Sequence, residues 1–164
     1  MLAMKRLFGL CACALVACGG SSSSTSNAPT GGMTDDDEIF AVVIFHELDG
    51  ASLASGEGVC IGARGAVNDG TALLAAVRSR YPTAVPDGQC SGGGPDGSHV
   101  VVNATKAKAV RIDIGPIEWA QEQGKATIAS GGAYRAGGVH EVEYTLEKHG
   151  SKWQITATKP KIMT

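Results

Sequence analysis

The chain has 164 residues, of which 14 are basic and 16 are acidic, so its formal net charge is −2. It shows no basic patch or stripe, and the charge pattern therefore gives no support to nucleic-acid binding. Glycine is frequent, with 23 residues, and aromatic residues make up only 5% of the chain, so we expect a core built from Val, Ile, Leu and Ala.

The first residues have the pattern of an export signal. Lys5 and Arg6 form a short basic segment, and an apolar run, LFGLCACALVA, follows at residues 7–17. This run suits the apolar core of a secretory signal and falls short of the roughly 20 residues that span a bilayer. We therefore expect residues 1–17 to be a signal peptide.

Leu15-Val16-Ala17-Cys18 closes the apolar run and resembles the lipobox of bacterial lipoproteins. The resemblance implies cleavage just before Cys18 and a diacylglycerol on its sulfur, which makes Cys18 the lipidated N-terminus of a protein of the cell envelope. The absence of Asp after Cys18 favours the outer membrane if lipoprotein sorting of the common double-membrane kind applies, and an outer-membrane or periplasm-facing location is expected over the cytoplasm. A plain secretory signal ending at Ala17 and an uncleaved buried helix are the alternatives.

Residues 19–34, GGSSSSTSNAPTGGMT, predict a flexible tether behind the lipidated cysteine. Gly, Ser, Thr, Asn and Pro dominate this segment, which cannot bury enough apolar surface to offset chain entropy. Sixteen such residues span roughly 20–24 Å as a coil, enough to hold a domain clear of a headgroup layer. Residues 18–34 are thus the lipidated cysteine with its tether, and residues 35–164 remain for a single domain.

The five cysteines divide along these segments. Cys11 and Cys13 lie inside the predicted signal peptide, where no third metal ligand is nearby. Cys18 takes the lipid, which leaves Cys60 and Cys90. In an exported, oxidising setting this even remainder predicts one disulfide, which would contribute roughly 3.5–4 kcal/mol by closing a loop of about 30 residues. A metal site is not expected, because neither cysteine has a CxxC partner and the four histidines are scattered. A catalytic thiol is not expected either, because a thiol beside a second lone cysteine would be oxidised in this compartment.

Residues 34–50 predict a helix. Thr34 can cap it, Asp37 follows three residues later as in a capping box, and the acidic first turn favours the positive helix end. Apolar residues recur at helical spacing up to Gly50, where we expect the helix to stop. The run IFAVVIF also fits a buried strand, and the cap decides in favour of the helix.

The next segment predicts a strand and a second helix. GVCIGA at residues 58–63 is a short apolar run bounded by glycine. Asn68-Asp69 can cap a helix over roughly residues 70–80, which must end where Tyr81 precedes proline. Residues 82–98 then predict a long loop with two Pro-Asp-Gly turns, which the disulfide would tie to the strand.

From His99 onward the apolar period changes to two. Apolar residues alternate with charged or polar ones in three stretches: Val110-Ile112-Ile114, Val142-Tyr144-Leu146 and Trp153-Ile155-Ala157. Such alternation is typical of an antiparallel sheet with one covered face. Turns at residues 121–125, 133–139 and 148–151 would join the strands into a meander. We expect Trp153 to be buried opposite Leu146.

GVCIG, the loop cysteine Cys90, VRIDIGPIEW and EYTLEKHGSKWQI together resemble a family of uncharacterised bacterial exported proteins over roughly residues 58–156. The closing hairpin with Tyr144 and Trp153 is also similar to the end of nuclear-transport-factor-two-like and cystatin-like folds. This second resemblance implies helices against a bent sheet, sometimes enclosing an apolar pocket, whereas the family of exported proteins offers no activity to carry over to this chain. The predicted fold is therefore α+β, with two N-terminal helices packed on a curved antiparallel sheet of about four to six strands.

Several side chains have both a chemical and a structural interpretation, and the structural one is favoured for each. The acidic run at residues 35–38 lacks the alternating ligands of a calcium loop. Ser91-Gly92-Gly93-Gly94 lacks the GK[ST] and the following helix of a phosphate loop. Glu118 beside Trp119 resembles a carboxyl whose pKa an apolar wall raises, but an outward strand residue is the simpler interpretation.

The histidines and aromatic residues give no clear site either. The sequence gives no evidence that any of the four histidines lie close to one another in the fold; they are His46, His99, His140 and His149. A G-x-S-x-G elbow for hydrolysis is missing. Four aromatic residues can line a pocket: Trp119, Tyr134, Tyr144 and Trp153. Tyr144 and Trp153 fall on the apolar face and are predicted as core.

These features predict a lipid-anchored envelope protein that acts by binding, with no catalytic, cofactor or metal residues. Its partners would be the membrane, through the lipid on Cys18, and an unknown protein or small apolar ligand. A structural envelope component and a small pocket enzyme are the alternatives. An inward-facing carboxyl or histidine in a pocket would favour the enzyme, and an exposed apolar patch over a filled core would favour an adaptor.

Overall fold

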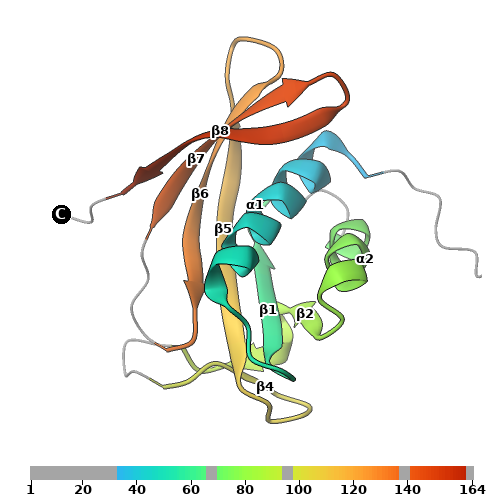
Figure 1. Ribbon diagram of the computed structural model, residues 1–164, viewed down its shortest axis with the longest axis vertical. Coiled ribbons are helices and arrows are strands. Elements are labelled where there is room, and N and C mark those ends of the chain that lie inside the picture. Colours follow the sequence, from blue (N-terminus) through green and yellow to red (C-terminus); the bar gives the residue numbers. More distant parts are fainter. Residues whose placement is uncertain (1–32, 66–69, 94–97, 137–140, 162–164) are drawn as a thin grey trace, which may run out of the picture. The chain divides into compact units, whose positions relative to one another are not determined.

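Two α-helices and a six-stranded sheet make up most of the part of the chain that the structure describes (Figure 1). This computed structural model describes residues 33–65, 70–93, 98–136 and 141–161. The predicted signal peptide at residues 1–17, the lipidation site Cys18 and the tether as far as residue 32 lie outside the described residues. So do three shorter predicted features: the cap Asn68-Asp69, the turn at residues 95–97 and the turn at Gly137-Gly138. The α+β class is confirmed.

The first helix, α1 (Asp35–Ala51), begins with the predicted capping box. The Thr34 hydroxyl accepts a hydrogen bond from the Asp37 N–H at 3.2 Å, and the Asp37 carboxylate accepts one from the Thr34 N–H at 3.2 Å. The helical interpretation is thus confirmed over the strand. The helix does not stop at Gly50, because the left-handed residue that ends it is Ser52, with φ 49°.

The following strand and helix are also confirmed. β1 (Gly58–Ala63) covers the predicted apolar run, and α2 (Thr71–Arg80) follows it. The helix ends at Tyr81, where the next residue is proline and disfavours helical geometry.

The predicted loop over residues 82–98 contains more structure than expected. It starts with β2 (Ala84–Pro86), continues into the 3-10 helix η2 (Asp87–Gln89) and reaches β3 (Cys90–Ser91). β3 pairs with β4 (Val101–Val102) in a separate two-stranded sheet. Strands of two or three residues are too short to show the alternation that identifies a strand in a sequence.

The main sheet has the strand order β2-β1-β5-β6-β7-β8. Its last four strands are β5 (Ala109–Trp119), β6 (Lys125–Tyr134), β7 (Val142–His149) and β8 (Lys152–Pro160). They pair as an antiparallel meander, as predicted.

The other edge of the sheet corrects the prediction of a wholly antiparallel sheet. β1 runs parallel to both of its neighbours, β2 and β5. The helix between β1 and β2 explains the first of these pairings. A chain that leaves one strand, passes through a helix and returns to the neighbouring position enters the sheet in the same direction. The sheet is therefore mixed, although most of its pairings are antiparallel.

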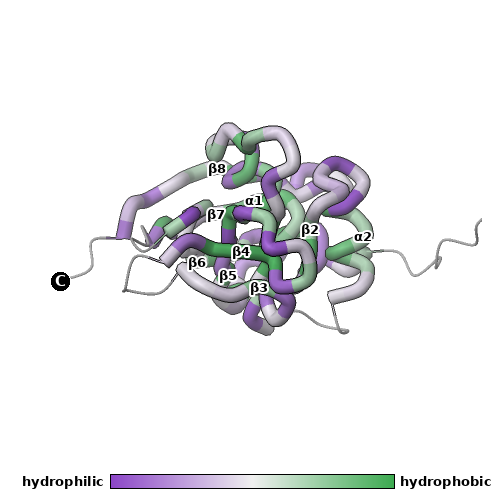
Figure 2. The backbone as a smooth tube through the Cα atoms, turned by 90° about the horizontal axis from the view of Figure 1, so that it is seen from below, coloured by the Kyte–Doolittle hydropathy of each residue, from purple (hydrophilic) through white to green (hydrophobic). Residues whose placement is uncertain are grey.

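One cluster of buried side chains joins both helices to the sheet. Figure 1 shows α1 lying across the strands, with α2 over the β1–β2 edge. The largest fully buried members come from α1, β5, β6 and β7: Ile39, Phe40, Ile44, Leu48, Ile112, Ile114, Ile128 and Leu146. In Figure 2 the strongly hydrophobic segments gather in the middle of the fold.

Trp153 is only 4% exposed, so its predicted burial is confirmed. The predicted partner is wrong, because Trp153 pairs with Lys148, and Leu146 pairs with Ile155. The tight turn at Gly150-Ser151 leaves His149 opposite Lys152 and so sets this register. Leu146 and Trp153 thus share a face without lying directly opposite each other.

The alternation of β8 also breaks after Ile155. A register shift between Thr145 and Leu146 places an extra residue of β8 between two pairs. Such a bulge moves the residues beyond it to the other face. Ala157, which the sequence predicted on the covered face, is consequently exposed.

β1 is covered on both faces, which explains its unbroken apolar sequence. Val59 belongs to the main core, whereas Cys60 belongs to a second buried cluster with Val100, Val102 and Ala109. The segment that follows β2 therefore folds back over the reverse face of the sheet, where the disulfide lies.

Candidate functional site

An apolar groove of about 510 Å³ opens beside α2. Its size lies within the range of small-molecule sites, roughly 300–1,000 Å³. We name it the α2 groove, and its main lining residues are Ile61, Ala63, Leu73, Leu74, Arg78 and Pro86. The parallel crossover creates this groove, since it sets α2 over the ends of β1 and β2.

Arg78 is the charged residue among the described residues that line the α2 groove. Its Nε donates a hydrogen bond to the Ala84 carbonyl at 2.8 Å, which fixes the start of the guanidinium against β2. The residue is exposed, so its charge meets solvent at the groove. An apolar wall with one cation suits a ligand that has an apolar body and an anionic end.

Arg80 lies two residues further along α2 and does not line the groove, because it contacts the end of α1 instead. Its Nη2 lies 2.6 Å from Asp49 Oδ1, and the Tyr81 hydroxyl donates to the same oxygen at 2.7 Å. Burial, together with the hydrogen bond to Asp49, raises the pKa of Tyr81. This pair of contacts connects the ends of the two helices, while Arg78 stays at the groove.

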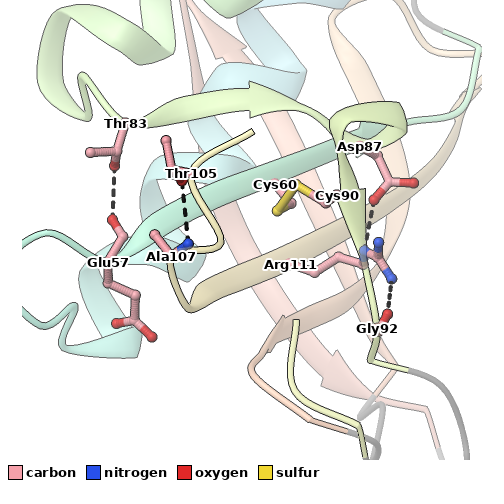
Figure 3. Close-up of a disulfide and its surroundings, with 9 residues drawn as sticks. All are labelled: Glu57, Cys60, Thr83, Asp87, Cys90, Gly92, Thr105, Ala107 and Arg111. Atoms are coloured by element: carbon pink, nitrogen blue, oxygen red, sulfur yellow. Dashed lines mark hydrogen bonds and ion pairs between the residues drawn. A yellow bond between two sulfur atoms is a disulfide. The ribbon is translucent and has the colours of Figure 1, made fainter. Parts of the chain in front are cut away.

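The disulfide between Cys60 and Cys90 is confirmed, with a Cα–Cα distance of 6.2 Å. Figure 3 shows that an arginine supports the same segment. Arg111 Nε lies 2.7 Å from Asp87 Oδ1, and Arg111 Nη1 donates to the Gly92 carbonyl at 2.7 Å. The sequence analysis missed this role of Arg111, because its partners lie 19 or more positions away along the chain.

Tyr134 completes this region on the neighbouring strand. Its hydroxyl donates to Asp113 Oδ2 at 2.6 Å. Burial, followed by the hydrogen bond to Asp113, raises the pKa of Tyr134 to about 12. The phenol therefore stays protonated at neutral pH and donates its hydrogen bond to Asp113. Together with the contacts of Arg111, this bond indicates that the region around the disulfide has a structural role.

A second hollow of about 460 Å³ has several charged residues in its lining. Among the residues that line it are Arg64, Asp113, Glu118, Glu141 and Lys161. The Lys161 ammonium and the Glu141 carboxylate form an ion pair at 2.7 Å. Glu118 is exposed, as predicted for an outward strand residue.

The histidines in the described part of the chain do not contact one another. His46 is exposed and lies edge-on to Tyr144, with ring centroids 5.4 Å apart. His99 and His149 are exposed, and His140 lies outside the described residues. Within the described ranges, no group of three or more His, Cys, Asp or Glu side chains is placed to hold a metal ion.

The aromatic residues separate into core and surface. Tyr144 is buried and donates to Glu47 Oε1 at 2.7 Å; burial, followed by that hydrogen bond, raises its pKa. Trp153 is also core, as predicted. Trp119 is 48% exposed and lies edge-to-face on Trp153 at 5.5 Å.

The two other candidate motifs are used by the fold. Asp37 caps α1, and Asp35 pairs with Lys148 at 2.6 Å. In the glycine run, the Gly92 carbonyl accepts from Arg111 and the Gly93 N–H donates to the Ser98 carbonyl at 2.9 Å. Gly94 lies outside the described residues.

No protein-family model matches this chain, and comparisons with curated proteins and with solved structures gave no match either. The lipobox and the family resemblance drawn from the sequence therefore stay predictions. Of the helices in the described part of the chain, none is both long and apolar enough to cross a membrane.

Proposed function

We propose that the mature protein is a lipid-anchored module of the cell envelope, attached to the outer membrane through Cys18, that binds a small apolar ligand with an anionic end in the α2 groove. The lipobox-like residues around Cys18 support this location at the membrane. The proposal assumes that both helices pack on a curved sheet. In such an arrangement a pocket can open between a helix and the edge of a strand.

The observation that carries the proposal is the composition of the α2 groove. Leu73 is buried against the core, whereas Leu74 is half-buried and leaves part of its side chain at the groove. Apolar walls release water when an apolar ligand covers them, and this release favours binding. Arg78 supplies a charge of one sign at the same place, so it selects an anionic end group.

The test is a titration of the Cys18→Ser chain, separated from its signal and free of lipid, with cis-parinaric acid, a fluorescent fatty acid. We expect saturable binding at one site per chain. Leu74→Gln places a polar group in the groove wall and should weaken binding about tenfold. Leu53→Gln is the matched control, because Leu53 is half-buried against the main core outside the groove.

A second pair of variants tests the charge. Arg78→Gln should weaken binding of the acid but leave binding of its methyl ester unchanged. Arg80→Gln changes the neighbouring arginine, which pairs with Asp49 instead of lining the groove, and should have neither effect. If the Leu74 and Arg78 variants bind like their controls, the groove is not the site and a structural envelope role becomes the better interpretation.

A further inference from the structure

Trp119 is the large hydrophobic side chain that the described part of the chain leaves exposed. It ends β5 and pairs with Ala126 of β6, a member of the main core. Trp119 therefore continues the core-facing side of the sheet, and its edge-to-face contact with Trp153 keeps it attached to that core. An exposed tryptophan with one buried and one solvent-facing side has the amphipathic character of residues at membrane interfaces.

The start of α1 lies at the same end of the fold as Trp119. Lys148 connects the two: its Nζ binds Asp35 at 2.6 Å and lies 5.8 Å from the centre of the Trp153 ring. The Lys148 N–H also donates to the Gly124 carbonyl in the β5–β6 turn at 2.8 Å. Figure 1 shows the β5–β6 turn, the β7–β8 turn and the start of α1 together at one end, with β4 at the other.

The length of the preceding segment restricts how the domain can sit on a membrane. If Cys18 carries lipid, the sixteen residues between it and Asp35 have an average span of roughly 20–24 Å as a coil. β5 alone has 11 residues and is on the order of 35 Å long. On average this span is shorter than β5, so the end of the domain at which α1 starts, which is the Trp119 end, lies nearer to the bilayer.

The charges around Trp119 are largely paired within the protein. The Lys125 ammonium Nζ lies 2.8 Å from Glu122 Oε2 and 3.6 Å from Glu147 Oε1, and the Lys148 ammonium forms an ion pair with Asp35. Lys152, at the start of β8, is exposed and has no such partner among the described residues, but Asp36 and Glu147 at this end also leave the acidic groups more numerous than the basic ones. This end therefore offers no surplus of basic groups to an anionic surface. Contact with a bilayer must then come from the indole and not from lysines.

From these observations we propose that Trp119 rests in the headgroup region of the membrane to which Cys18 is anchored, so that the domain stands with the β5–β6 and β7–β8 turns toward the bilayer. The inference rests on the proposed lipid anchor. A single indole is a weak contact, but a short tether raises its effective concentration to about the millimolar range. The contact should therefore need the anchor and be insensitive to anionic lipid.

The test uses the lipidated protein reconstituted into phosphatidylcholine vesicles whose acyl chains are brominated near the headgroup. Bromine quenches nearby tryptophan, and the difference in emission between the wild type and Trp119→Phe isolates Trp119. We expect the Trp119 emission to fall about twofold and shift to the blue, as for an interfacial indole. Adding anionic lipid or salt should change neither effect.

A matched variant reports on the opposite end. Ala104 is exposed in the turn between β4 and the start of β5, and Trp119 lies at the other end of β5. In Trp119→Phe/Ala104→Trp, the emission added relative to Trp119→Phe isolates position 104. It should show no quenching by bromine and stay open to acrylamide. Equal quenching at positions 104 and 119 would overturn the proposed orientation.

The remaining outcomes separate this inference from the proposed anchor. Vesicle flotation reports on the anchor alone, and protein that does not float contradicts the anchor. Protein that floats while Trp119 keeps full access to acrylamide contradicts the membrane contact only. If Trp119 is already shielded from acrylamide in the secreted Cys18→Ser chain without vesicles, the chain's own N-terminal segment covers it and the inference is wrong. Shielding that appears only in whole envelopes points to a protein partner instead.

Discussion

At the scale of single residues, Arg135 connects segments of the described chain that lie far apart in the sequence. Its Nε lies 2.6 Å from Glu57 Oε1, and its Nη2 donates to Glu57 Oε2 at 2.9 Å and to the Ala51 carbonyl at 3.0 Å. These bonds join the segment after β6 to the end of α1. The Glu57 side chain is only 7% exposed, so the pair is shielded from solvent on one side.

Glu57 predicts a dependence of stability on pH. The hydrogen bond from Arg135 lowers the pKa of Glu57 below its ordinary value of 4.5, against the opposing effect of burial. The stabilisation is therefore present above the unfolded pKa, about 4.5, and is lost as the pH falls through the lower folded pKa. Glu57→Gln should destabilise the protein at pH 7 and lose this dependence, as urea unfolding at several pH values would reveal.

Glu122→Gln is the control for this experiment. The pKa of Glu122 is also lowered, chiefly by its hydrogen bond with Lys125, but this pair is exposed. Exposed ion pairs contribute little to stability, so the control should unfold like the wild type at each pH. If the difference between Glu57→Gln and the wild type stays constant as the pH falls, the predicted link between pairing and stability is wrong.

Trp153 carries the second prediction at this scale. Because its ring is buried against the core cluster, Trp153→Ala should lower the free energy of unfolding by about 3–5 kcal/mol. Trp119→Ala removes the same side chain from an exposed position and should cost much less. A loss below about 1 kcal/mol for Trp153→Ala, measured by urea unfolding, would contradict the burial and restore a binding role for this residue.

The two tryptophans also mark what the sequence can predict at this scale. Both occupy core-facing positions, but only Trp153 stands within a clear alternating run. Whether a core-facing residue is covered depends on where the helix above it begins. Trp119 is exposed because it lies at the end of β5, and the local sequence has no signal for that.

At the scale of elements, the helices and the four-stranded meander could be predicted because each has a local signal. The capping box identifies α1, proline ends α2, and alternation identifies β5, β7 and β8. β6 has no such run, and only the predicted turns on either side of it, at residues 121–125 and 133–139, indicate a strand between β5 and β7. The parallel pairing of β1 with β2 has no such signal, since it joins residues about 25 positions apart through a strand of three residues. The α2 groove depends on this crossover, so the candidate site could not be predicted with the fold.

The disulfide gives the prediction that belongs to the elements. It connects β1 to β3 across the reverse face of the sheet and closes a loop with a sequence separation of 30. Replacing both Cys60 and Cys90 by Ser should cost roughly 3.5–4 kcal/mol, because the unfolded chain regains the freedom that the bridge removes. The Arg111 contacts with Asp87 and Gly92 should keep the segment in place, so the variant should still fold.

Mass mapping of the exported protein under non-reducing conditions checks the bridge itself. It should find a peptide that links positions 60 and 90. If both thiols react freely with an alkylating reagent under native, non-reducing conditions, the bridge is absent in the exported protein. A reactive thiol would then favour the enzyme alternative.

At the scale of the whole molecule, the address and the folded domain come from separate parts of the chain. The proposed location at the membrane rests on residues 1–18, which lie outside the described residues, whereas the groove and the Trp119 end belong to the domain. Sequence patterns for export are local and can be recognised without a fold. The function of the domain depends on surfaces formed by distant residues, and these become visible only in the structure.

This separation makes Cys18→Ser a clean test of the anchor. The thiol of Cys18 is the atom that would take the diacylglycerol, so the variant should lose fatty-acid labelling and stay uncleaved or be released as soluble protein. Once separated from its signal, it should still bind the anionic probe in the α2 groove, because Cys18 is not among the groove residues. Metabolic labelling with a radioactive fatty acid and cell fractionation provide the measurements.

Labelling that persists in Cys18→Ser would show that the lipid site is wrong. A wild-type chain that begins at residue 18 without lipid would favour the plain secretory signal, and the membrane contact of Trp119 would then lose its basis.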